Sequence, residues 1–448
     1  MKYRTLLFLL TFPFLSLSAQ TSDHIFQKLE GYWQGAFIKG NAAQSISLRF
    51  FETKGTYYAL QMMQEWYPQF GEFEVPVTID SLGKINMSTG YGPVEMVLDS
   101  NNLEIIGHIP GTDPTVNIHI KKTPPPPATT YEVTEISVPN GEVNLYGHLH
   151  SPKYGEKKTA IILVGGRSCY AGDTRYDLYA KVLREYGISV LVFNKRGTGK
   201  STGDCDAATV GDLASDVIAC QRFLRQHPNG YKTIGVLGSS AGGWVMTKAL
   251  EKTDFDFMIS VVGPSTSVRD QQIQSGEYGG RFYKLSDATI QQIKTYTDLM
   301  FDAPANEEGF AQFQALLEQA EQEGWKELLD GTDIPHTAAG IDSLWVRRHG
   351  FDPGPSLANY QHPMLVIYGE IDWIVPYKEN IARLEELFAG DRRKLLRTVI
   401  AHNAEHGTEV EEGYIQLSNR KSYWHFYRIS AQVNIEIVNF LRENKWIP

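Results

Sequence analysis

The pentapeptide at 238–242, with the sequence Gly-Ser-Ser-Ala-Gly, constrains the fold of this chain more than any other segment. It stands between an apolar run at 233–237 and a helix-like segment at 244–252. Glycines two residues before and two residues after a serine permit the sharp turn that joins a strand to a helix. Such a turn places the hydroxyl of Ser240 at a helix N-terminus, where backbone N–H groups stabilise negative charge. Because glycine-rich chains contain this pattern by chance, its flanks and its downstream partners decide its meaning.

Length and charge limit the class of protein. At 448 residues the chain exceeds one ordinary hydrophobic core, which predicts two or three domains. The net charge of −10 argues against nucleic acid and against an anionic membrane surface as partners, since both attract basic patches. We therefore expect a globular protein whose charge serves solubility.

Residues 1–19 are typical of a secretory signal peptide. Lys2 and Arg4 form a short basic start, residues 6–17 are apolar, and the small residues at 16–19 suit cleavage before Gln20. The apolar stretch is short for a membrane span, and an uncleaved anchor is the alternative. We expect an exported protein, periplasmic or secreted, with no stable membrane insertion.

The cysteines are Cys169, Cys205 and Cys220. An odd and sparse set predicts neither a disulfide framework nor a metal site. One pair can oxidise in an exported protein, but the sequence does not say which. We expect buried free thiols.

Residues 20–122 form a β-rich accessory domain. Strand-like alternation covers residues 45–50, 56–62, 94–98, 103–108 and 115–120, with turn residues between them. The pattern predicts a small antiparallel sheet or barrel. The opening Gly31-Tyr32-Trp33 resembles the Gly-x-Trp start of lipocalin-like barrels, which can hold a ligand. We expect instead that side chains fill the interior of this domain.

A proline-rich linker at 123–130 separates this domain from the rest of the chain. Its four consecutive prolines, 124–127, favour a semi-rigid polyproline II spacer. From residue 131 the pattern changes, because the strand-like segments 131–138 and 143–149 flank a turn at 139–141 and predict a hairpin.

Beyond the hairpin, short apolar strands alternate with helical segments. The expected strands are 160–164, 189–193, 233–237, 257–262, 364–368 and 395–400, and the expected helices include 176–186 and 210–226. This alternation predicts a mostly parallel sheet with both faces covered, in a domain over 131–448. Residues of about 265–350 interrupt it with polar, helix-prone sequence, which we interpret as a helical cap over the site.

A serine nucleophile needs a base to take its proton and a carboxylate to orient that base. In a strand–turn–helix setting the expected chain order is serine, acid, histidine. Asp372 follows the strand at 364–368 and is our candidate acid, with Glu370 as the alternative. His406 precedes a glycine on the loop after the next strand and is our candidate base, with His402 as the alternative.

The tetrahedral intermediate of such a reaction needs two N–H donors, together called the oxyanion hole. We expect one from the amide of Ala241 and the other from the loop after residue 164, with Arg167 favoured and Gly166 as the alternative. The guanidinium of Arg167 suggests recognition of a carboxylate or of sugar hydroxyls on the substrate. A surface salt bridge, for example to Asp173, is the plainer alternative.

Residues 131–448 resemble the α/β-hydrolase superfamily, and in particular bacterial exported serine esterases with a helical cap. The resemblance rests on the pentapeptide, on residues 193–201, on residues 369–376 and on His406-Gly407. The last three are similar to the family motifs Asp-x-Arg-Gly-x-Gly-x-Ser, Gly-x-x-Asp-x-x-Val-Pro and His-Gly. The resemblance implies an α/β-hydrolase fold with a helical cap, here preceded by the small all-β domain.

The chain departs from this family in two places. The family's His-Gly at the oxyanion loop is Gly165-Gly166 here, and Arg167 stands where a small residue is usual. These changes leave the second donor and the mouth of the pocket open. The segment at 196–199 lacks the spacing of a phosphate-binding loop, so we interpret it as a structural turn with Arg196 buried against the pentapeptide region.

The sequence therefore predicts a serine hydrolase that cleaves carboxylic esters of small molecules through an acyl-enzyme on Ser240, His406 and Asp372, with no metal and no organic cofactor. One alternative is a serine peptidase on the same fold, and a catalytically silent binding module is another. A further alternative is a carbohydrate-ester esterase whose β-rich domain binds sugar. Its candidate stacking residues are Tyr57, Tyr58, Trp66, Tyr67 and Phe70. The sequence does not predict the acyl group, the leaving group or the oligomeric state.

Overall fold

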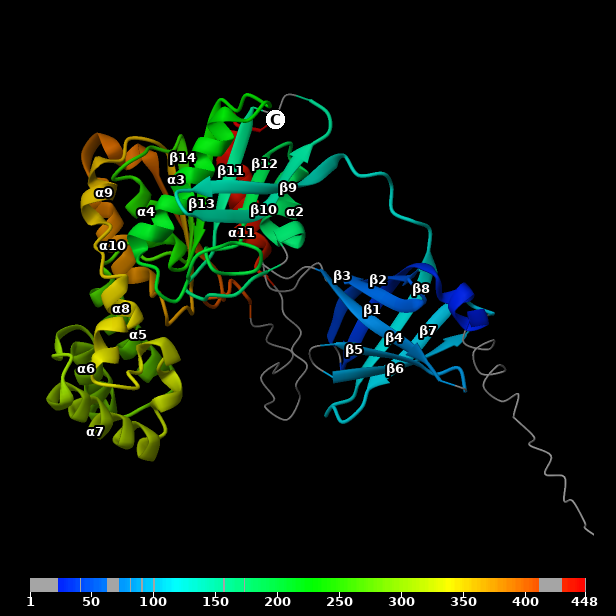
Figure 1. Ribbon diagram of the computed structural model, residues 1–448, viewed down its shortest axis with the longest axis horizontal. Helices are drawn as coiled ribbons and strands as arrows, with labels where there is room; N and C mark the ends of the chain where they lie inside the picture. The colour runs from blue at the N-terminus through cyan, green and yellow to red at the C-terminus, as the bar shows by residue number, and fades with distance from the viewer. Residues whose placement is uncertain are drawn as a thin grey trace, which may run out of the picture. The chain divides into compact units, whose positions relative to one another are not determined.

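The computed structural model describes residues 23–40, 42–62, 72–80, 82–89, 92–99, 101–155, 158–172, 174–410 and 429–447. Within these residues the chain divides into two compact units, one over 23–128 and the other over 129–410 with 429–447 (Figure 1). The predicted signal peptide at 1–19 lies outside the described residues. Across the described residues, no helix combines the length and the apolar character that crossing a membrane requires.

The first unit is a closed antiparallel barrel in which each strand pairs with the next and β1 pairs with β8. A short helix at 23–29 precedes it. Its strands are β1 (Gly31–Lys39), β2 (Ala42–Thr53), β3 (Thr56–Met62), β4 (Glu72–Ile79), β5 (Ile85–Thr89), β6 (Gly92–Asp99), β7 (Glu104–Ile109) and β8 (Val116–Thr123). The expected barrel is thus confirmed, although the alternation predicted neither β1, β4 nor β5.

Apolar side chains fill the barrel interior. Trp33 and Phe37 of β1 are fully buried, and the indole N–H of Trp33 donates to the carbonyl of Leu29 at 2.6 Å. Of the aromatic residues proposed to stack on sugar, Tyr57 packs face to face on Phe26, with ring centroids 3.9 Å apart. Tyr58 stacks in turn on Phe51. The other three, Trp66, Tyr67 and Phe70, lie outside the described residues.

The second unit contains a sheet in the order β16-β15-β14-β13-β11-β12-β10-β9. The six strands from β11 to β16 run parallel to their neighbours, whereas the hairpin of β9 and β10 pairs antiparallel at one edge. The strands are β9 (Tyr131–Asn140), β10 (Val143–Pro152), β11 (Thr159–Val164), β12 (Ser189–Phe193), β13 (Thr233–Ser239), β14 (Phe257–Val261), β15 (Met364–Gly369) and β16 (Leu396–Ala401). The mostly parallel sheet that the apolar runs predicted is confirmed.

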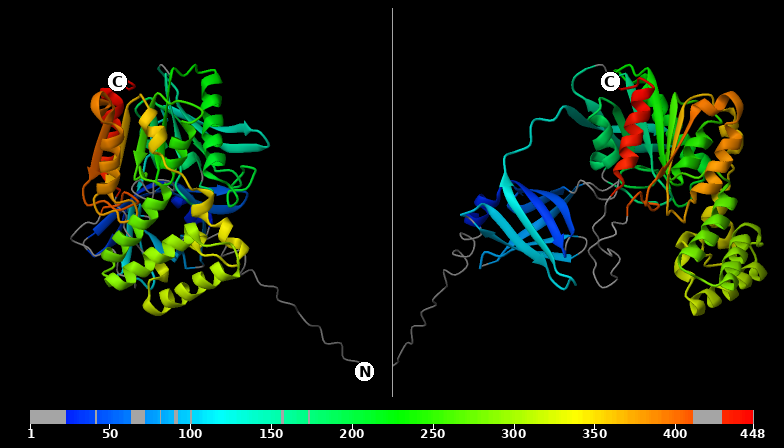
Figure 2. Two further views of the ribbon diagram at one scale, coloured as in Figure 1. Left: turned by 90° about the vertical axis from the view of Figure 1, so that its left-hand side faces the viewer. Right: turned by 180° about the vertical axis from the view of Figure 1, so that it is seen from behind.

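Helices cover both faces of this sheet. One face packs against α2 (Leu178–Arg184) and α11 (Ala431–Glu443). The other packs against α3 (Val210–Gln226), α4 (Gly242–Ala249), α9 (Gly354–Asn359) and α10 (Tyr377–Leu387). In Figure 1 α11 lies behind the sheet, and the reverse view in Figure 2 brings it to the front. The strand order, the parallel connections and the two helical layers are those of the α/β-hydrolase fold.

A helical insertion separates β14 from β15, as the sequence predicted. It contains α5 (Val268–Phe282), α6 (Asp287–Asp302), α7 (Glu307–Glu323) and α8 (Trp345–Arg348), with the 3-10 turns η2 (Lys326–Leu328), η3 (Gly331–Asp333) and η4 (Ala339–Ser343). Ser267, Ser286 and Asn306 cap the first three helices, because each side-chain oxygen accepts a backbone N–H of the first turn. Figure 1 shows α5, α6 and α7 gathered in one lobe.

The expectation that the cysteines are free thiols is wrong. Cys169 and Cys205 form a disulfide, with Cα atoms 5.8 Å apart, and only Cys220 is a buried free thiol. The bond ties the loop after β11 to the loop after β12, a proximity that arises only when the parallel strands pair.

Arg196, which the sequence predicted to be buried against the pentapeptide region, forms its hydrogen bonds with α3. Its Nε donates to Asp216 of α3 at 2.9 Å, and its Nη2 donates to the other oxygen of the same carboxylate at 2.9 Å. A third hydrogen bond, of 2.8 Å, reaches the carbonyl of Asp212. Asp216 is buried, and a buried carboxylate needs a charged partner. Arg196 is that partner.

We expect replacement of Arg196 by Ala to lower the free energy of unfolding by about 3–5 kcal/mol, because it leaves the buried Asp216 carboxylate without its partner charge. The matched control is Arg225→Ala, which breaks an exposed ion pair with Asp256 and should cost less than about 1 kcal/mol. Urea denaturation of both variants measures the difference. Equal effects would contradict this account of Arg196.

Candidate active site

Ser240 stands at the turn between β13 and α4. β13 ends at Ser239, α4 begins at Gly242, and the backbone of Ser240 has a φ of 51°. This left-handed conformation costs about 1–3 kcal/mol in a residue with a side chain and persists only where its neighbours enforce it. The Ser240 N–H donates to the carbonyl of Val261 at 3.0 Å, so the next strand of the sheet holds the turn in place.

The flanking glycines are needed because backbone approaches them closely. A Cβ atom on Gly238 would lie 2.6 Å from the carbonyl oxygen of Gly242. A Cβ on Gly242 would in turn overlap the carbonyl oxygen of Val164 at the end of β11. The pentapeptide therefore fits together only with glycine at both ends, which accounts for its spacing.

The side chains of Ser240, His406 and Asp372 form one hydrogen-bonded chain. Ser240 Oγ lies 2.9 Å from His406 Nε2, and His406 Nδ1 lies 2.8 Å from Asp372 Oδ2. The Asp372 side chain is fully buried, and its Oδ1 accepts the backbone N–H groups of Ile374 and Val375 at 2.9 Å each. These bonds leave Oδ2 directed at the histidine, with Nδ1–H as its donor.

The two alternatives contact each other instead. Glu370 Oε2 accepts the backbone N–H of Asn403 at 2.8 Å and pairs with His402 Nδ1 at 2.6 Å. The His402 side chain is 85% exposed. The bond from Asn403, together with the neighbouring His402, lowers the pKa of Glu370 below its usual value. Both residues thus form a surface pair, and the carboxylate and imidazole that meet Ser240 are those of Asp372 and His406.

Two of the candidate oxyanion donors, Ala241 and Gly166, lie next to Ser240. Ala241 is the N-cap residue of α4, and no side chain caps that helix end. Gly166 lies against the serine, because a Cβ built on it would sit 3.2 Å from Ser240 Cβ. Lys195 Nζ donates to the carbonyls of Gly166 and, at 3.1 Å, Ser168.

The guanidinium of Arg167 is bound to the helical insertion. Asp173, the partner that the sequence suggested, lies outside the described residues. Arg167 Nη2 donates to Asp333 Oδ2 at 2.5 Å and to Thr332 Oγ1 at 2.6 Å. The Arg167 guanidinium also stacks on the ring of Trp345 at 4.2 Å. These contacts agree with the plainer salt-bridge interpretation, with a different partner, and leave little of the guanidinium open to a substrate carboxylate.

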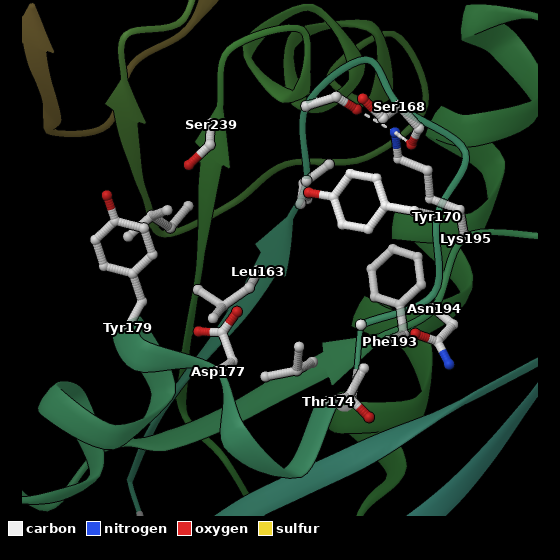
Figure 3. Close-up of a pocket in the computed structure, with 16 residues that line it drawn as sticks. Leu163, Ser168, Tyr170, Thr174, Asp177, Tyr179, Phe193, Asn194, Lys195 and Ser239 are labelled. Carbon is white, nitrogen blue, oxygen red and sulfur yellow. Dashed lines mark hydrogen bonds between the residues drawn. The ribbon is translucent and has the colours of Figure 1, made fainter. Parts of the chain in front are cut away.

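A mainly apolar pocket with a few polar side chains opens beside this loop. Figure 3 shows Asp177 and Tyr179 from the start of α2, Ser239 from the end of β13 and Lys195 from the loop after β12 around it. Asp177 is the N-cap of α2 and accepts the N–H of Ala180. Burial raises the pKa of the Asp177 carboxyl to about 7, and the same cause lowers the pKa of Lys195 to about 8.

Several of these residues escaped the sequence analysis. Lys195 and Asp177 carry no local signal, since each gains its meaning from burial in the fold. Asp333 pairs with Arg167 across 166 positions of chain.

Within the described ranges, no group of three or more His, Cys, Asp or Glu side chains is arranged to hold a metal ion.

We expect Asp177→Asn to remove a pH dependence of stability. A carboxyl with a raised folded-state pKa contributes stability that is full below its unfolded pKa of about 3.9 and lost as the pH rises through about 7. Between about pH 4 and about pH 8 the wild type should lose up to about 4 kcal/mol relative to the variant. Asn keeps the helix cap. Urea unfolding across this range measures the difference, and parallel curves would refute the prediction.

Comparison with known proteins adds a family match over part of the chain. Residues 155–333, less than half of the chain, match the family described as serine aminopeptidase, S33. The match spans Ser240, Arg167 and Asp333 but ends before Asp372 and His406. No curated protein sequence matches the chain.

The chain also resembles several solved structures. An esterase of Pyrococcus furiosus is 17% identical, covers 70% of this chain and 91% of its own, and has a TM-score of 0.41. Est1E of Butyrivibrio proteoclasticus, solved with ferulic acid bound, is 16% identical over 68% of this chain and 99% of its own, with a TM-score of 0.42. An acylaminoacyl peptidase of Pyrococcus horikoshii is 16% identical over 89% and 59%, with a TM-score of 0.41.

At such identities the fold assignment rests on the strand order and connections described above. The sheet carries a serine at a strand-to-helix turn, and the family match covers that turn. The second unit therefore has an α/β-hydrolase fold, and residues 155–333 within it are similar to the serine aminopeptidase family, S33.

Proposed function

We propose that the protein is a carboxylic-ester hydrolase in which Ser240 is the nucleophile, His406 the general base and acid, and Asp372 the residue that orients the histidine. The observation that carries the proposal is the hydrogen-bonded chain from Ser240 Oγ through His406 to the buried Asp372. Serine, acid and histidine follow in the order expected for this fold.

In the acylation step, Ser240 Oγ attacks the ester carbonyl carbon while its proton moves to His406 Nε2. Asp372 Oδ2 accepts the Nδ1–H bond and stabilises the imidazolium that forms. Negative charge develops on the carbonyl oxygen, and the amides of Ala241 and Arg167 are its proposed donors. The C–O bond of the ester then breaks, and His406 gives its proton to the departing alkoxide.

In the deacylation step, water replaces the alcohol. His406 takes a proton from this water as its oxygen attacks the acyl carbon, and the same two amides bind the oxyanion. Collapse of the intermediate breaks the bond to Ser240 Oγ, which regains the proton from His406. The products are a carboxylic acid and the free enzyme.

The charges beside the site favour a neutral substrate. An aminopeptidase binds a substrate ammonium through carboxylates that lie free near the serine. Asp333 and Asp330, the cap carboxylates beside the Arg167 loop, already face the Arg167 guanidinium at 2.5 and 3.6 Å. Both carboxylates are already paired with this guanidinium before any substrate enters, so neither lies free for a substrate ammonium, which supports an ester over a peptide with a free N-terminus.

One residue favours a peptidase as the second candidate, in keeping with the description of the matched family. Burial raises the pKa of Glu409 to about 7, and its buried Oε1 accepts no hydrogen bond from the described chain. The carboxyl carbon lies 3.2 Å from where a Cβ on Gly407 would stand, next to His406. A substrate ammonium is a chemically suitable partner for this oxygen.

We expect Ser240→Ala to lower kcat/KM on p-nitrophenyl esters more than about 10³-fold with the fold retained, since the acyl-enzyme cannot form. Ser239→Ala is the matched control, because it removes the adjacent hydroxyl and should still react with a fluorophosphonate probe. Undiminished turnover by Ser240→Ala would refute the proposal.

A parallel panel of aminoacyl p-nitroanilides separates the two candidates. Turnover of the anilides above that of the esters, lowered by Glu409→Gln, would establish the peptidase instead.

We further propose that the protein is exported, to the periplasm or beyond. The disulfide between Cys169 and Cys205 supports this, because such bonds persist in oxidising compartments. Alkylation in denaturant without reductant should label Cys220 alone, and prior reduction should expose all three cysteines. Recovery of the protein in the cytoplasm alone, with three thiols labelled before reduction, would contradict the proposal.

A further inference from the structure

The loop after β11 is restrained on both sides of the residue that we propose as second oxyanion donor. Before Arg167, the carbonyl of Gly166 accepts a hydrogen bond from Lys195 Nζ. After it, the carbonyl of Ser168 binds the same ammonium at 3.1 Å (Figure 3). The next residue, Cys169, is bonded to Cys205. The hydrogen bonds from Lys195 and the disulfide thus restrain the backbone on both sides of Arg167.

The bond from Lys195 also orients the amide of Arg167. A trans peptide holds its C=O and N–H in one plane and in opposite directions. Because the Gly166 carbonyl is directed at Lys195, the N–H of Arg167 is directed away from it. Lys195 is bonded to carbonyls alone in this loop, so its role here is to set the peptide plane.

The side chain of Arg167 extends from this loop to the helical insertion. Besides its bonds to Thr332 and Asp333, its guanidinium packs on Trp345 of α8, whose ring in turn lies 6.1 Å from that of Trp244 on α4. The Arg167 side chain is 19% exposed and that of Asp333 is 3% exposed. This is a buried ion pair between the oxyanion loop and the cap.

Asp333 is itself held firmly by the cap. Its Oδ1 accepts the backbone N–H of Val346 at 3.4 Å, and its carbonyl oxygen accepts the hydroxyl of the fully buried Tyr296 at 2.9 Å. The position of the Asp333 carboxylate therefore depends on the positions of α6, η3 and α8. A shift of these elements moves the partner of Arg167 or breaks the pair.

We propose that Asp333 is a positioning residue of the cap, which holds the Arg167 amide in its oxyanion-binding orientation through the guanidinium of the same residue. This inference rests on the proposed function and extends it. The oxyanion hole is then complete only when the cap is seated on the loop, so the cap controls the chemical step as well as substrate binding.

The energetic scale follows from the donor itself. Loss of one oxyanion donor lowers kcat by about 10²–10³-fold. A displaced donor keeps part of its interaction, so loss of the ion pair should cost about tenfold in kcat. Because the oxyanion forms only in the transition state, KM should change little.

The test is steady-state turnover of p-nitrophenyl acetate by Asp333→Asn, Arg167→Lys and the double variant. We choose an acetyl ester because its small acyl group needs few contacts with the cap. A change in kcat then reflects the position of the Arg167 amide and not the binding of the acyl group. We expect each single variant to lose about tenfold in kcat with KM nearly unchanged. The double variant should lose no more than either single variant, because both break the same interaction.

The matched control is Asp342→Asn, which breaks an ion pair with Arg347 inside the cap and should retain wild-type kcat. An unchanged kcat in Asp333→Asn, a rise in KM alone, or an equal loss in the Asp342 variant would each overturn the proposal. A wild type that turns over neither esters nor aminoacyl anilides would refute the proposed function, whereas an active wild type with an equally active Asp333 variant refutes this inference alone.

Discussion

The left-handed backbone at Ser240 is the constraint on which the rest of the hydrolase domain depends. That conformation is unfavourable for a residue with a Cβ atom, so other contacts must enforce it. The carbonyl of Val261 binds the Ser240 N–H, and the contacts at Gly238 and Gly242 leave no room for a side chain. The turn therefore exists only when β11, β13 and β14 are paired in register, and the sheet must form before the serine is presented.

The same geometry draws the loop after β11 into the site. Gly242 packs on the carbonyl of Val164, the last residue of β11, and Gly166 packs on Ser240 itself. Residues 166–169 are then held by an ammonium, an ion pair and a disulfide in succession. Oxyanion donors act by being oriented before charge develops. A loop with this many restraints meets that requirement without rearrangement during the reaction.

Sequence patterns found the strands of the sheet because each is a short, uninterrupted apolar run, and they found Ser240, Asp372 and His406 because each follows such a run. They missed β4, whose Pro76 is atypical of a strand, and β1, which contains glycine at position 35. Only the barrel explains Gly35, since a Cβ there would overlap the carbonyl of His119.

Local sequence patterns also did not identify side-chain partners that are far apart in the sequence. Cys169 and Cys205 are 36 positions apart and meet because β11 and β12 are neighbours. The partner of Arg196 is on α3, and that of Arg167 is in the cap. The sequence analysis also did not name α11, but here a local signal exists. Its buried positions have the spacing of a helix, which a search for periodicity would detect: Val433, Ile437, Phe440 and Leu441.

The pairing of Arg167 with Asp333 also bears on selectivity. A cation that departs from the family pattern beside the serine would ordinarily attract an anionic substrate. Here two cap carboxylates face it, so its charge is compensated within the protein. Burial raises the pKa of Asp333, whereas the nearby guanidinium opposes that rise. Arg167 therefore acts on the position of its own backbone, and selectivity for the substrate must come from other residues around the cleft.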